Sequence, residues 1–395
     1  MSKFAAVIIV SVLVFVSCSV NTTSVDKLKE NLADLKNNFA PDHRTAVFNY
    51  SININKKPVE LSVETTEPEI LSRLRSYLNK NKIQVKENFK LLPDEKLKDK
   101  IYGIVNLSTA NLRTKPKHSA EMATQALLGT VVKVLKKNDG WLMVQTPDKY
   151  ISWIEADAIA QINKQELKKY FTGKRIIYIS DFGFSYETAN KKSSRVSDLV
   201  AGDILQVKKE LRHFYQVKYP DGREAFIPKS NCSEFTKWTK QFRVSAISVI
   251  DTAKAFTGIP YLWGGTSEKG FDCSGFTKTV YYLNRIILPR DASQQALVGT
   301  FVDSTVNLDK FQPGDLLFFG KRGRDIKSSK VVHVGIYVGN GKFIHASGMV
   351  KRNSLKKNDV DFNEYRYNTF LFARRILNSV GKKGVQTILS NKFYY

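Results

Sequence analysis

Short apolar strands separated by turn residues dominate residues 101–235, and no other feature restricts the fold of this chain as strongly. In residues 103–160, strand-like stretches alternate with turns such as Asn138-Asp139-Gly140, and residues 170–235 repeat the same order more loosely. Many short strands at close spacing predict a small β-barrel, not a parallel sheet or a helical bundle. The middle of the chain therefore predicts two small barrels in tandem, and such modules usually bind or position a ligand.

Composition indicates a folded chain with a strong positive charge. Hydrophobic residues make up 42% of the 395 residues, which excludes a disordered or collagen-like chain. The 62 Lys and Arg residues against 37 Asp and Glu give a net charge of +25, so polyanions attract the chain. The basic residues are dispersed along the sequence, and we expect no nucleic-acid partner. Three cysteines exclude a disulfide-rich scaffold.

The N-terminal sequence predicts that the protein is localised to the cell envelope. The 13 residues from Phe4 to Val16 are apolar except for Ser11. As a helix they would rise about 20 Å, which is short of a ~30 Å hydrocarbon core and fits a signal peptide. The segment Phe15-Val16-Ser17-Cys18 resembles a bacterial lipobox, which implies cleavage after residue 17 and a lipid anchor on Cys18. We expect a membrane-anchored lipoprotein of the bacterial envelope that faces the periplasm. An ordinary cleaved signal with an incidental cysteine is the alternative.

Residues 24–100 predict a small α+β domain without a chemical motif. Leucines over 28–39 recur at helical spacing, residues 46–65 alternate like a hairpin, and residues 70–78 predict a second helix. Residues 19–26 in front of the first helix are typical of a polar tether.

One cysteine and two histidines in the C-terminal part form a candidate catalytic set. Cys273 precedes a stretch of helical spacing, which places it near the N-terminus of a helix. The helix dipole and free amides there favour a thiolate and a developing oxyanion. A cysteine nucleophile needs a base, and the base needs an orienting partner. Cys273, His333 and His345 have the chemistry for these three roles.

The two histidines lie on neighbouring strands of a predicted hairpin, and the pairing register decides whether they share a face. A two-residue Asn340-Gly341 turn pairs His345 with Ile336 and points it away from His333. A three-residue loop or a bulge pairs His345 with Gly335 and puts both histidines on one face. The sequence permits either register.

Other interpretations of these residues stay open at this point. A lone cysteine is more often part of an inert core, and a strand histidine more often structural. Cys273 also has Cys232 as a possible disulfide partner. Cysteine and two histidines are zinc ligands as well, although no closely spaced ligand pair supports a zinc site.

Six motifs follow one another in residues 250–376. They are Tyr261-Leu-Trp-Gly-Gly, Phe271-Asp-Cys-Ser-Gly-Phe, Leu288-Pro-Arg, Pro313-Gly-Asp-Leu, His333-Val-Gly-Ile-Tyr-Val-Gly and Ile344-His-Ala-Ser. In this order they resemble the NlpC-type family of papain-like cell-wall cysteine peptidases. Residues 103–160 resemble bacterial SH3-like domains. The combination is similar to the gamma-D-glutamyl-L-diamino-acid endopeptidases of the dipeptidyl-peptidase VI type.

The resemblance implies a cysteine peptidase without a cofactor or metal. Cys273 would be the nucleophile, His333 the general base and His345 the residue that orients it, which implies the register with both histidines on one face. The implied reaction cleaves the γ-D-glutamyl–diamino acid bond of peptidoglycan stem peptides through a thiolate acyl-enzyme, for muropeptide turnover or recycling. The alternatives are a hydrolase of intact cross-linked peptidoglycan and a non-catalytic wall-binding lipoprotein.

The resemblance also implies a set of substrate contacts. In such relatives the first SH3-like domain caps the cleft, and the enzyme recognises a free N-terminal L-Ala. The matching peptide-binding positions here are Asp272, Ser274, Ser293, Tyr150 and Trp263. A carboxylate suits an ammonium group, although capping of the helix N-terminus is an alternative role for Asp272.

The expected fold class is a multidomain α+β chain. Its expected parts are a lipoprotein signal peptide at residues 1–17, a tether and small α+β domain at 18–100, SH3-like β-barrels at 101–162 and 163–240, a papain-like α+β peptidase domain at 241–378 and a C-terminal tail at 379–395.

Overall fold

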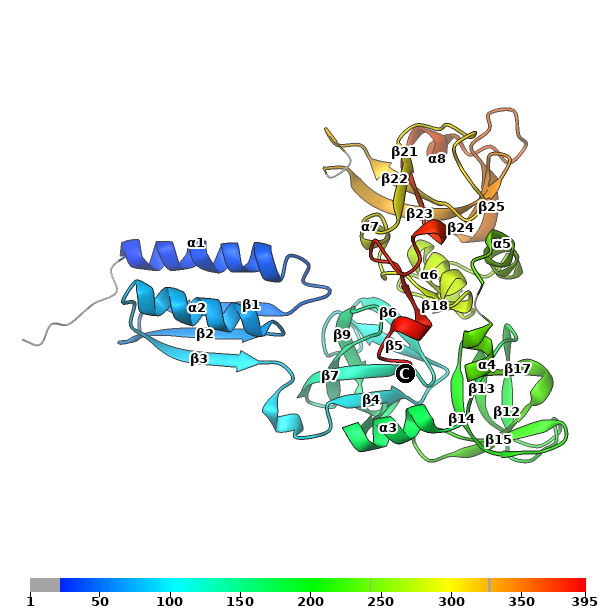
Figure 1. Ribbon diagram of the computed structural model, residues 1–395, viewed down its shortest axis with the longest axis horizontal. Helices are drawn as coiled ribbons and strands as arrows, with labels where there is room; N and C mark the ends of the chain where they lie inside the picture. Colours follow the sequence, from blue (N-terminus) through cyan, green and yellow to red (C-terminus); the bar gives the residue numbers. More distant parts are fainter. Residues whose placement is uncertain (1–21, 242, 326–327) are drawn as a thin grey trace, which may run out of the picture. The chain divides into compact units, whose positions relative to one another are not determined.

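The computed structural model describes residues 22–241, 243–325 and 328–395 (Figure 1). The predicted signal peptide at residues 1–17 and the predicted lipidation site Cys18 lie outside the described residues. Over the described ranges, no helix is both long and apolar enough to span a bilayer. The chain divides after Leu92 into two compact units, of which the second begins at Pro93.

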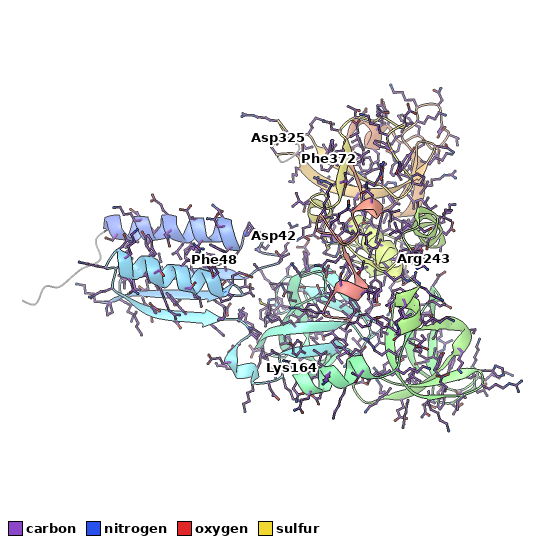
Figure 2. All side chains as sticks on the ribbon, viewed as in Figure 1. Asp42, Phe48, Lys164, Arg243, Asp325 and Phe372 are labelled. Atoms are coloured by element: carbon purple, nitrogen blue, oxygen red, sulfur yellow. The ribbon has the colours of Figure 1, made fainter. Side chains whose placement is uncertain are left out.

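The first unit is a three-stranded sheet with two helices. Its elements are α1 (Thr22–Phe39), β1 (Phe48–Asn53), β2 (Val59–Thr65), α2 (Pro68–Lys80) and β3 (Val85–Leu91). Strand β2 lies in the middle, antiparallel to β1 and parallel to β3, so α2 forms the crossover between β2 and β3. Phe48, labelled in Figure 2, packs with Leu61 and Leu74 in one core. The two predicted helices and the hairpin are confirmed.

The prediction of a polar tether over residues 19–26 is wrong at its end, because helix α1 begins at Thr22. Val25 is buried together with Leu28 and Leu32, while Asp26 and Lys27 are exposed. Val25 therefore extends the apolar stripe of the helix by one turn toward the N-terminus, and its burial stabilises that turn.

The second unit begins with a seven-stranded barrel. Its strands are β4 (Tyr102–Val105), β5 (Thr109–Arg113), β6 (Met122–Leu127), β7 (Val131–Asn138), β8 (Trp141–Gln145), β9 (Ile151–Glu155) and β10 (Ile159–Ile162). They pair in the order β10-β4-β7-β8-β9-β5-β6 around an aliphatic core that includes Leu112, Val132 and Leu142. Alternating burial along β5 follows from the period of two in a strand.

A second set of seven strands follows helix α3 (Lys164–Thr172). Its strands are β11 (Arg175–Tyr178), β12 (Phe182–Tyr186), β13 (Arg195–Val200), β14 (Ile204–Glu210), β15 (Phe214–Lys218), β16 (Glu224–Pro228) and β17 (Cys232–Glu234). They pair in the order β13-β12-β16-β15-β14-β11-β17. Read from β17 to β13, this order equals that of the first barrel once seven is added to each strand number there, so that β4 corresponds to β11 and β10 to β17. The sequence repeat therefore corresponds to a repeat of topology.

The two barrels meet along the loops that contain Leu128 and Asp203. The Ile204 amide donates to the Leu128 carbonyl at 2.9 Å, and buried Asp203 accepts from the Leu128 amide at 3.2 Å. Gly129 has a φ of +77°, and a Cβ there would lie 2.0 Å from the Ile204 carbonyl oxygen. Only glycine permits this approach of the two backbones.

The remaining part of the unit places helices against an antiparallel sheet. Its helices are α4 (Phe235–Lys240), α5 (Ala246–Ala255), α6 (Cys273–Leu283), α7 (Ala292–Gln295) and α8 (Glu364–Asn368). The sheet has the order β21-β26-β22-β23-β24-β25, formed by Thr300–Asp303, Phe370–Arg375, Leu316–Lys321, Lys330–Gly339, Lys342–Ser347 and Met349–Ser354. Phe276 and Val280 of α6 pack with Phe318, Val334 and Ile336 of the sheet. A helix that begins at Cys273 thus lies against the strands that carry the histidines.

The C-terminal tail connects both barrels to this helix–sheet part, as the red segment of Figure 1 shows. Strand β27 (Gln386–Thr387) pairs with β20 (Ile286–Ile287). Asn391 donates to the carbonyl of Pro147 in the first barrel at 2.9 Å. Arg175 of β11 donates to the carbonyl of Tyr394, whose ring is buried.

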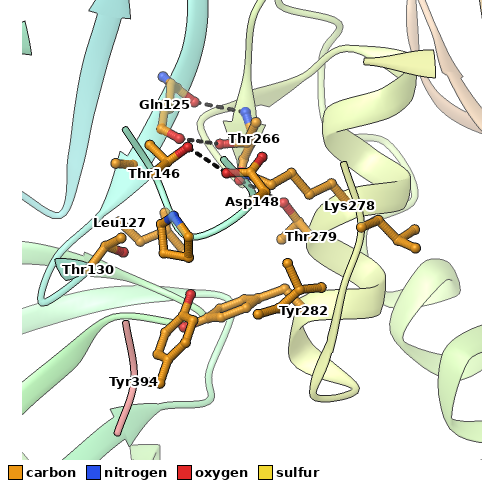
Figure 3. A pocket seen from close by; sticks show the side chains of 14 residues that line it. Gln125, Leu127, Thr130, Thr146, Asp148, Thr266, Lys278, Thr279, Tyr282 and Tyr394 are labelled. Atoms are coloured by element: carbon orange, nitrogen blue, oxygen red, sulfur yellow. Dashed lines mark hydrogen bonds and ion pairs between the residues drawn. The ribbon is translucent and has the colours of Figure 1, made fainter. Parts of the chain in front are cut away.

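Figure 3 shows a small cavity between the first barrel, α6 and the tail. Its volume is about 50 Å³, and its lining includes Thr130, Asp148, Lys278 and Tyr394. Ligand pockets are typically about 300–1,000 Å³, so this space is too small for a dipeptide. The ion pair between Lys278 and Asp148, at 3.0 Å, instead helps to join the barrel to α6.

Candidate active site

Cys273 is the first residue of helix α6, as predicted. The Asp272 side chain accepts a hydrogen bond from the Gly275 amide at 2.6 Å and so caps this helix. Cys273 is buried. Burial raises the pKa of its thiol to about 11, with a further contribution from the Asp272 charge, while the backbone amides of Val334 and Ser274 act in the opposite direction.

Burial of Cys273 therefore opposes the expected stabilisation of a thiolate by the helix N-terminus. A helix dipole contributes about 0.3–1 kcal/mol, and up to ~2 kcal/mol in partly buried positions. A net rise from 9.0 to about 11, with burial as its largest cause, corresponds to roughly 3 kcal/mol in favour of the neutral thiol. Burial exceeds the dipole, so Cys273 rests as a neutral thiol.

His333 on β23 and His345 on β24 lie on the same face of the sheet. Nε2 of His333 is 2.7 Å from Nδ1 of His345. The pairs Ile336–Ile344 and Tyr337–Phe343 continue to Gly335–His345, and a Cβ on Gly335 would lie 3.1 Å from the Cβ of His345. Gly339 pairs with Lys342, so the turn itself has two residues, and a bulge between Tyr337 and Gly339 then shifts the pairing by one residue. The bulge, one of the two routes that the sequence permits, thus brings the histidines together.

Asn353 on β25 extends the histidine pair to a chain of three groups. Its Oδ1 accepts from Nε2–H of His345 at 2.8 Å. The orientation of the amide follows from its other contacts, since its Nδ2 donates to the Asp361 carbonyl at 3.2 Å and its Oδ1 also accepts from Asn363 at 3.3 Å. Nδ1 of neutral His345 then accepts from Nε2–H of His333. This tautomer leaves Nδ1 of His333 as the basic nitrogen.

Both histidines are held in the neutral form. Burial lowers the pKa of His345 to about 4, and the hydrogen bond that His345 donates to Asn353 opposes this only in part. Burial, followed by the charge of Arg366, lowers the pKa of His333 well below its usual range. A neutral base and a neutral thiol require that the proton move as the sulfur attacks.

Two family models and several known proteins match parts of this chain. Residues 258–372 match the model of the NlpC/P60 family, and residues 112–159 match the bacterial dipeptidyl-peptidase Sh3 domain. The gamma-D-glutamyl-L-lysine dipeptidyl-peptidases of Bacillus cereus and Bacillus subtilis are each 31% identical to this chain. The alignments cover 57% and 56% of this chain and 67% and 71% of those proteins.

The chain belongs to the NlpC/P60 family. A crystal structure of an NlpC/P60 family protein from Bacillus cereus agrees in fold, with a TM-score of 0.59, 26% identity and coverage of 70% of this chain and 99% of the other. The chain is therefore a cysteine-type peptidase with an NlpC/P60 domain and an SH3-like domain.

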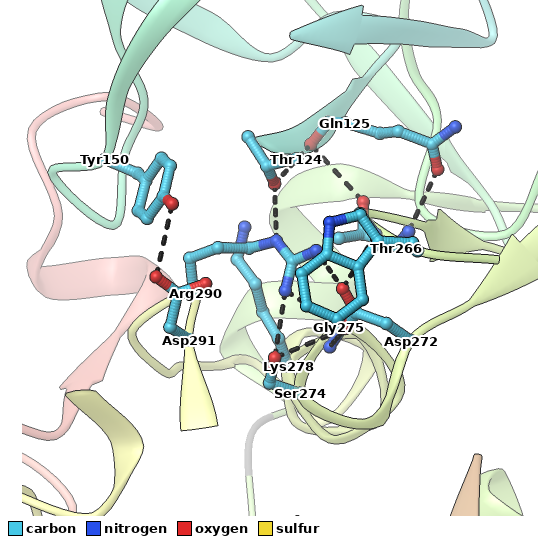
Figure 4. A network of polar contacts seen from close by, with 12 residues as sticks. Thr124, Gln125, Tyr150, Thr266, Asp272, Ser274, Gly275, Lys278, Arg290 and Asp291 are labelled. Atoms are coloured by element: carbon cyan, nitrogen blue, oxygen red, sulfur yellow. Dashed lines mark hydrogen bonds and ion pairs between the residues drawn. The ribbon is translucent and has the colours of Figure 1, made fainter. Parts of the chain in front are cut away.

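Two predicted substrate residues of the NlpC/P60 domain, Asp272 and Ser274, lie in a buried network (Figure 4). Arg290 donates to both carboxylate oxygens of Asp272 and, at 3.0 Å, to the Ser274 hydroxyl. It also donates to Thr124 of the first barrel at 2.8 Å. The Gly275 amide donates to Oδ1 of Asp272 and the Gly264 amide to Oδ2, so both carboxylate oxygens already accept hydrogen bonds from the protein. These contacts support the capping role of Asp272 over ammonium binding.

The other predicted substrate residues lie along the boundary between the SH3-like and NlpC/P60 domains. The hydroxyl of buried Tyr150 donates to Asp291 at 3.2 Å. Ser293 lies two residues farther along, in α7, and is half-buried. Trp263 is 61% exposed and donates through its indole nitrogen to Glu121 of the barrel at 2.7 Å. Tyr150 and Trp263 therefore each link the two domains.

Sequence reasoning missed Asn353 and Arg366 in the NlpC/P60 domain. Asn353 pairs with Phe343 on β24, two residues before His345, so the period of two puts it on the histidine face. The sequence could have indicated Asn353 through this period of two if residues 349–354 had been predicted as a strand paired with β24. Arg366 carried no such signal, because only the fold brings α8 to the site.

Two alternatives for the cysteine have no support in the structure. Cys232 and Cys273 are both free, so they form no disulfide. Among the described residues, no three or more His, Cys, Asp or Glu side chains are grouped to hold a metal ion.

Proposed function

We propose that this chain hydrolyses the γ-D-glutamyl–diamino acid bond of peptidoglycan stem peptides that carry a free N-terminal L-Ala. The observation that carries the proposal is the hydrogen-bonded pair of His333 and His345 next to the helix that begins at Cys273. Proteins named gamma-D-glutamyl-L-lysine dipeptidyl-peptidase share 31% identity with the chain, which supports the choice of bond.

In the proposed mechanism, Cys273 is the nucleophile. Nδ1 of His333 takes the thiol proton as the sulfur attacks the γ-carbonyl carbon of D-Glu. Backbone amides at the start of α6 stabilise the oxyanion. His333 returns the proton to the departing amine of the diamino acid, and water then hydrolyses the thioester. His345, held by Asn353, keeps the proton of His333 on Nε2 throughout.

For the free amine of L-Ala, we propose Asp291 and Tyr150 as the binding pair. The Tyr150 hydroxyl already contacts the Asp291 carboxylate at the boundary of the two domains. A carboxylate at a partly buried boundary binds an ammonium group by charge-assisted hydrogen bonds. In this arrangement the first barrel closes the site beyond L-Ala, so an N-acylated stem would not fit. Ser274, Ser293 and Trp263 remain proposed contacts to the peptide.

We further infer from the lipobox-like segment that Cys18 is lipid-modified and holds the enzyme at a bacterial membrane, facing the periplasm. The matched strand order of the two barrels supports a second SH3-like domain at residues 163–240. Mass spectrometry of the mature N-terminus tests the first inference, and an unmodified terminus would refute it.

Product analysis by mass spectrometry tests the proposed function. The chain from Ser19 is incubated with L-Ala-γ-D-Glu-meso-diaminopimelate, with its lysine counterpart and with the N-acetylated forms, beside the Cys273→Ala variant. We expect release of L-Ala-D-Glu from the free peptides alone and none from the variant. Equal cleavage of acetylated peptides would point to intact wall as the substrate, and no cleavage of any peptide would favour the wall-binding alternative.

A further inference from the structure

Arg366 is a cation beside the catalytic set that the mechanism above does not use. It lies on α8, and the cap of that helix, Asn363, accepts from the Arg366 amide at 3.0 Å. Asn363 also donates to Asn353, which holds His345. The helix that positions Arg366 is thus tied to the histidine chain.

The guanidinium of Arg366 lies close to Phe319, whose ring neighbours His333. Its central carbon lies 5.7 Å from the ring centre of Phe319, and that ring lies 5.9 Å from the ring of His333. Its charge acts on Cys273 and Tyr261 as well as on both histidines. The charge of this one side chain therefore acts on the residues to which the proposed mechanism assigns the attack on the scissile carbonyl.

No acidic side chain among the described residues forms an ion pair with Arg366. Three other arginines of this domain do have such a partner, since Arg290 pairs with Asp272, Arg352 with Asp361 and Arg375 with Asp315. Arg366 is half-buried, and burial lowers its pKa. A partly desolvated guanidinium without an anion is a recognition group for a carboxylate, because its fork of N–H donors matches two carboxylate oxygens.

We infer that Arg366 binds a carboxylate of the stem peptide adjacent to the scissile bond and so selects substrates in which that group is free. The inference rests on the proposed function. A γ-linked glutamate necessarily keeps its α-carboxyl group, and the diamino acid carries another next to the departing nitrogen. Both carboxylates lie near the carbonyl that Cys273 attacks, and conversion of either to an amide removes its charge with little change in shape.

The test measures kcat/KM on matched peptides that differ only in these groups. The reference peptide is L-Ala-γ-D-Glu-diaminopimelate, and it is compared with the α-amide of its D-Glu and with the α-amide at the L-centre of its diamino acid. The enzymes are wild type, Arg366→Gln and Arg366→Lys. Arg352→Gln is the matched control, because it removes the same charge nearby from an exposed pair with Asp361.

We expect wild type to prefer the free carboxylate over one of the two amides by about 10- to 100-fold, which is the range of a charge-assisted hydrogen bond. Arg366→Gln should lose this preference because its kcat/KM falls on the reference peptide and not on the amide that wild type rejects. Arg366→Lys should restore part of it, and Arg352→Gln should leave it intact. The amide that wild type rejects identifies which carboxylate Arg366 binds.

The inference is overturned if wild type cleaves the reference peptide and both amides equally well. It is also overturned if Arg366→Gln lowers kcat/KM on all three peptides by the same factor, because that result indicates a structural or purely electrostatic role. The wild-type preference needs no variant, so misfolding of Arg366→Gln does not obscure the result. Failure of wild type to cleave any peptide would refute the proposed function together with the inference.

Discussion

Arg290 and Asp272 form a bidentate ion pair inside the protein, with Nη1–Oδ1 and Nη2–Oδ2 distances of 3.1 and 2.5 Å. Arg290 is 1% exposed, and it also reaches Thr124 of the first barrel. Asp272 in turn caps the helix that begins at Cys273. One arginine therefore connects the barrel, the helix cap and the residue next to the nucleophile.

Replacement of Arg290 by Met should destabilise the protein strongly. The change leaves the Asp272 carboxylate buried without its counterion, and loss of one partner of a buried pair costs about 3–5 kcal/mol. Thermal unfolding monitored by calorimetry measures the effect. The control is Arg352→Gln, whose exposed pair with Asp361 should contribute less than about 1 kcal/mol. Equal shifts in Tm for both variants would contradict the role of Arg290.

The variant Cys273→Ala should abolish hydrolysis while the protein stays folded. Cys273 is buried but small, so the lost sulfur leaves only a minor cavity. The check combines product analysis with circular dichroism. Turnover above background in the folded variant would remove Cys273 from the role of nucleophile.

Asn353→Leu should lower kcat by about 10-fold or more with a smaller effect on KM. Leucine cannot accept the proton of Nε2 of His345, so the tautomer that leaves Nδ1 of His333 basic loses its support. The acidic limb of the pH–rate profile should also move to lower pH, because the Asn353 hydrogen bond raises the pKa of His345. An unchanged kcat and pH profile would show that Asn353 does not orient the pair.

The buried histidines should make the fold less stable in mild acid. The pKa of His345 is about 4 in the folded protein against 6.5 as its ordinary value. Between these values the unfolded chain binds a proton that the folded chain does not, so stability falls as the pH drops from about 6.5 to about 4. Tm measured over this range should fall less steeply in His345→Gln than in wild type. Parallel curves would contradict a neutral, buried His345.

Deletion of residues 391–395 should loosen the second unit. Asn391 and Tyr394 bond the tail to the first barrel and to Arg175, and buried Phe393 and Tyr394 pack against both barrels. Removal of two buried aromatic side chains costs several kcal/mol. Limited proteolysis should cleave the shortened chain between barrel and peptidase domains faster than wild type. Lys392→Gln, an exposed position, is the control and should leave the rate unchanged.

Several features of the fold could be predicted from the sequence because they depend on residues that are close together along the chain. Short apolar stretches between turn residues predicted the strands of residues 101–235, and the leucine stripe of α1 predicted its helix. Asn340-Gly341 predicted the histidine hairpin but not its register, since the bulge at residue 338 depends on how β23 packs against its neighbours. The extension of α1 to Thr22 was missed because the burial of Val25 is set by the core of the first unit.

The sequence by itself determined the family, the two runs of short strands and the three residues proposed for catalysis, because ordered motifs and turn residues are properties of neighbouring residues. Only the tertiary structure decided that His333 contacts His345, that Asn353 completes the chain and that Asp272 is already paired with Arg290. It also decided that Arg366 has no acidic partner within the part of the chain that the structure describes. The physical reason is the same in each case. Register, burial and charge pairing depend on groups that are far apart along the chain, and they arise only when the sheet, the helices and the first barrel pack together.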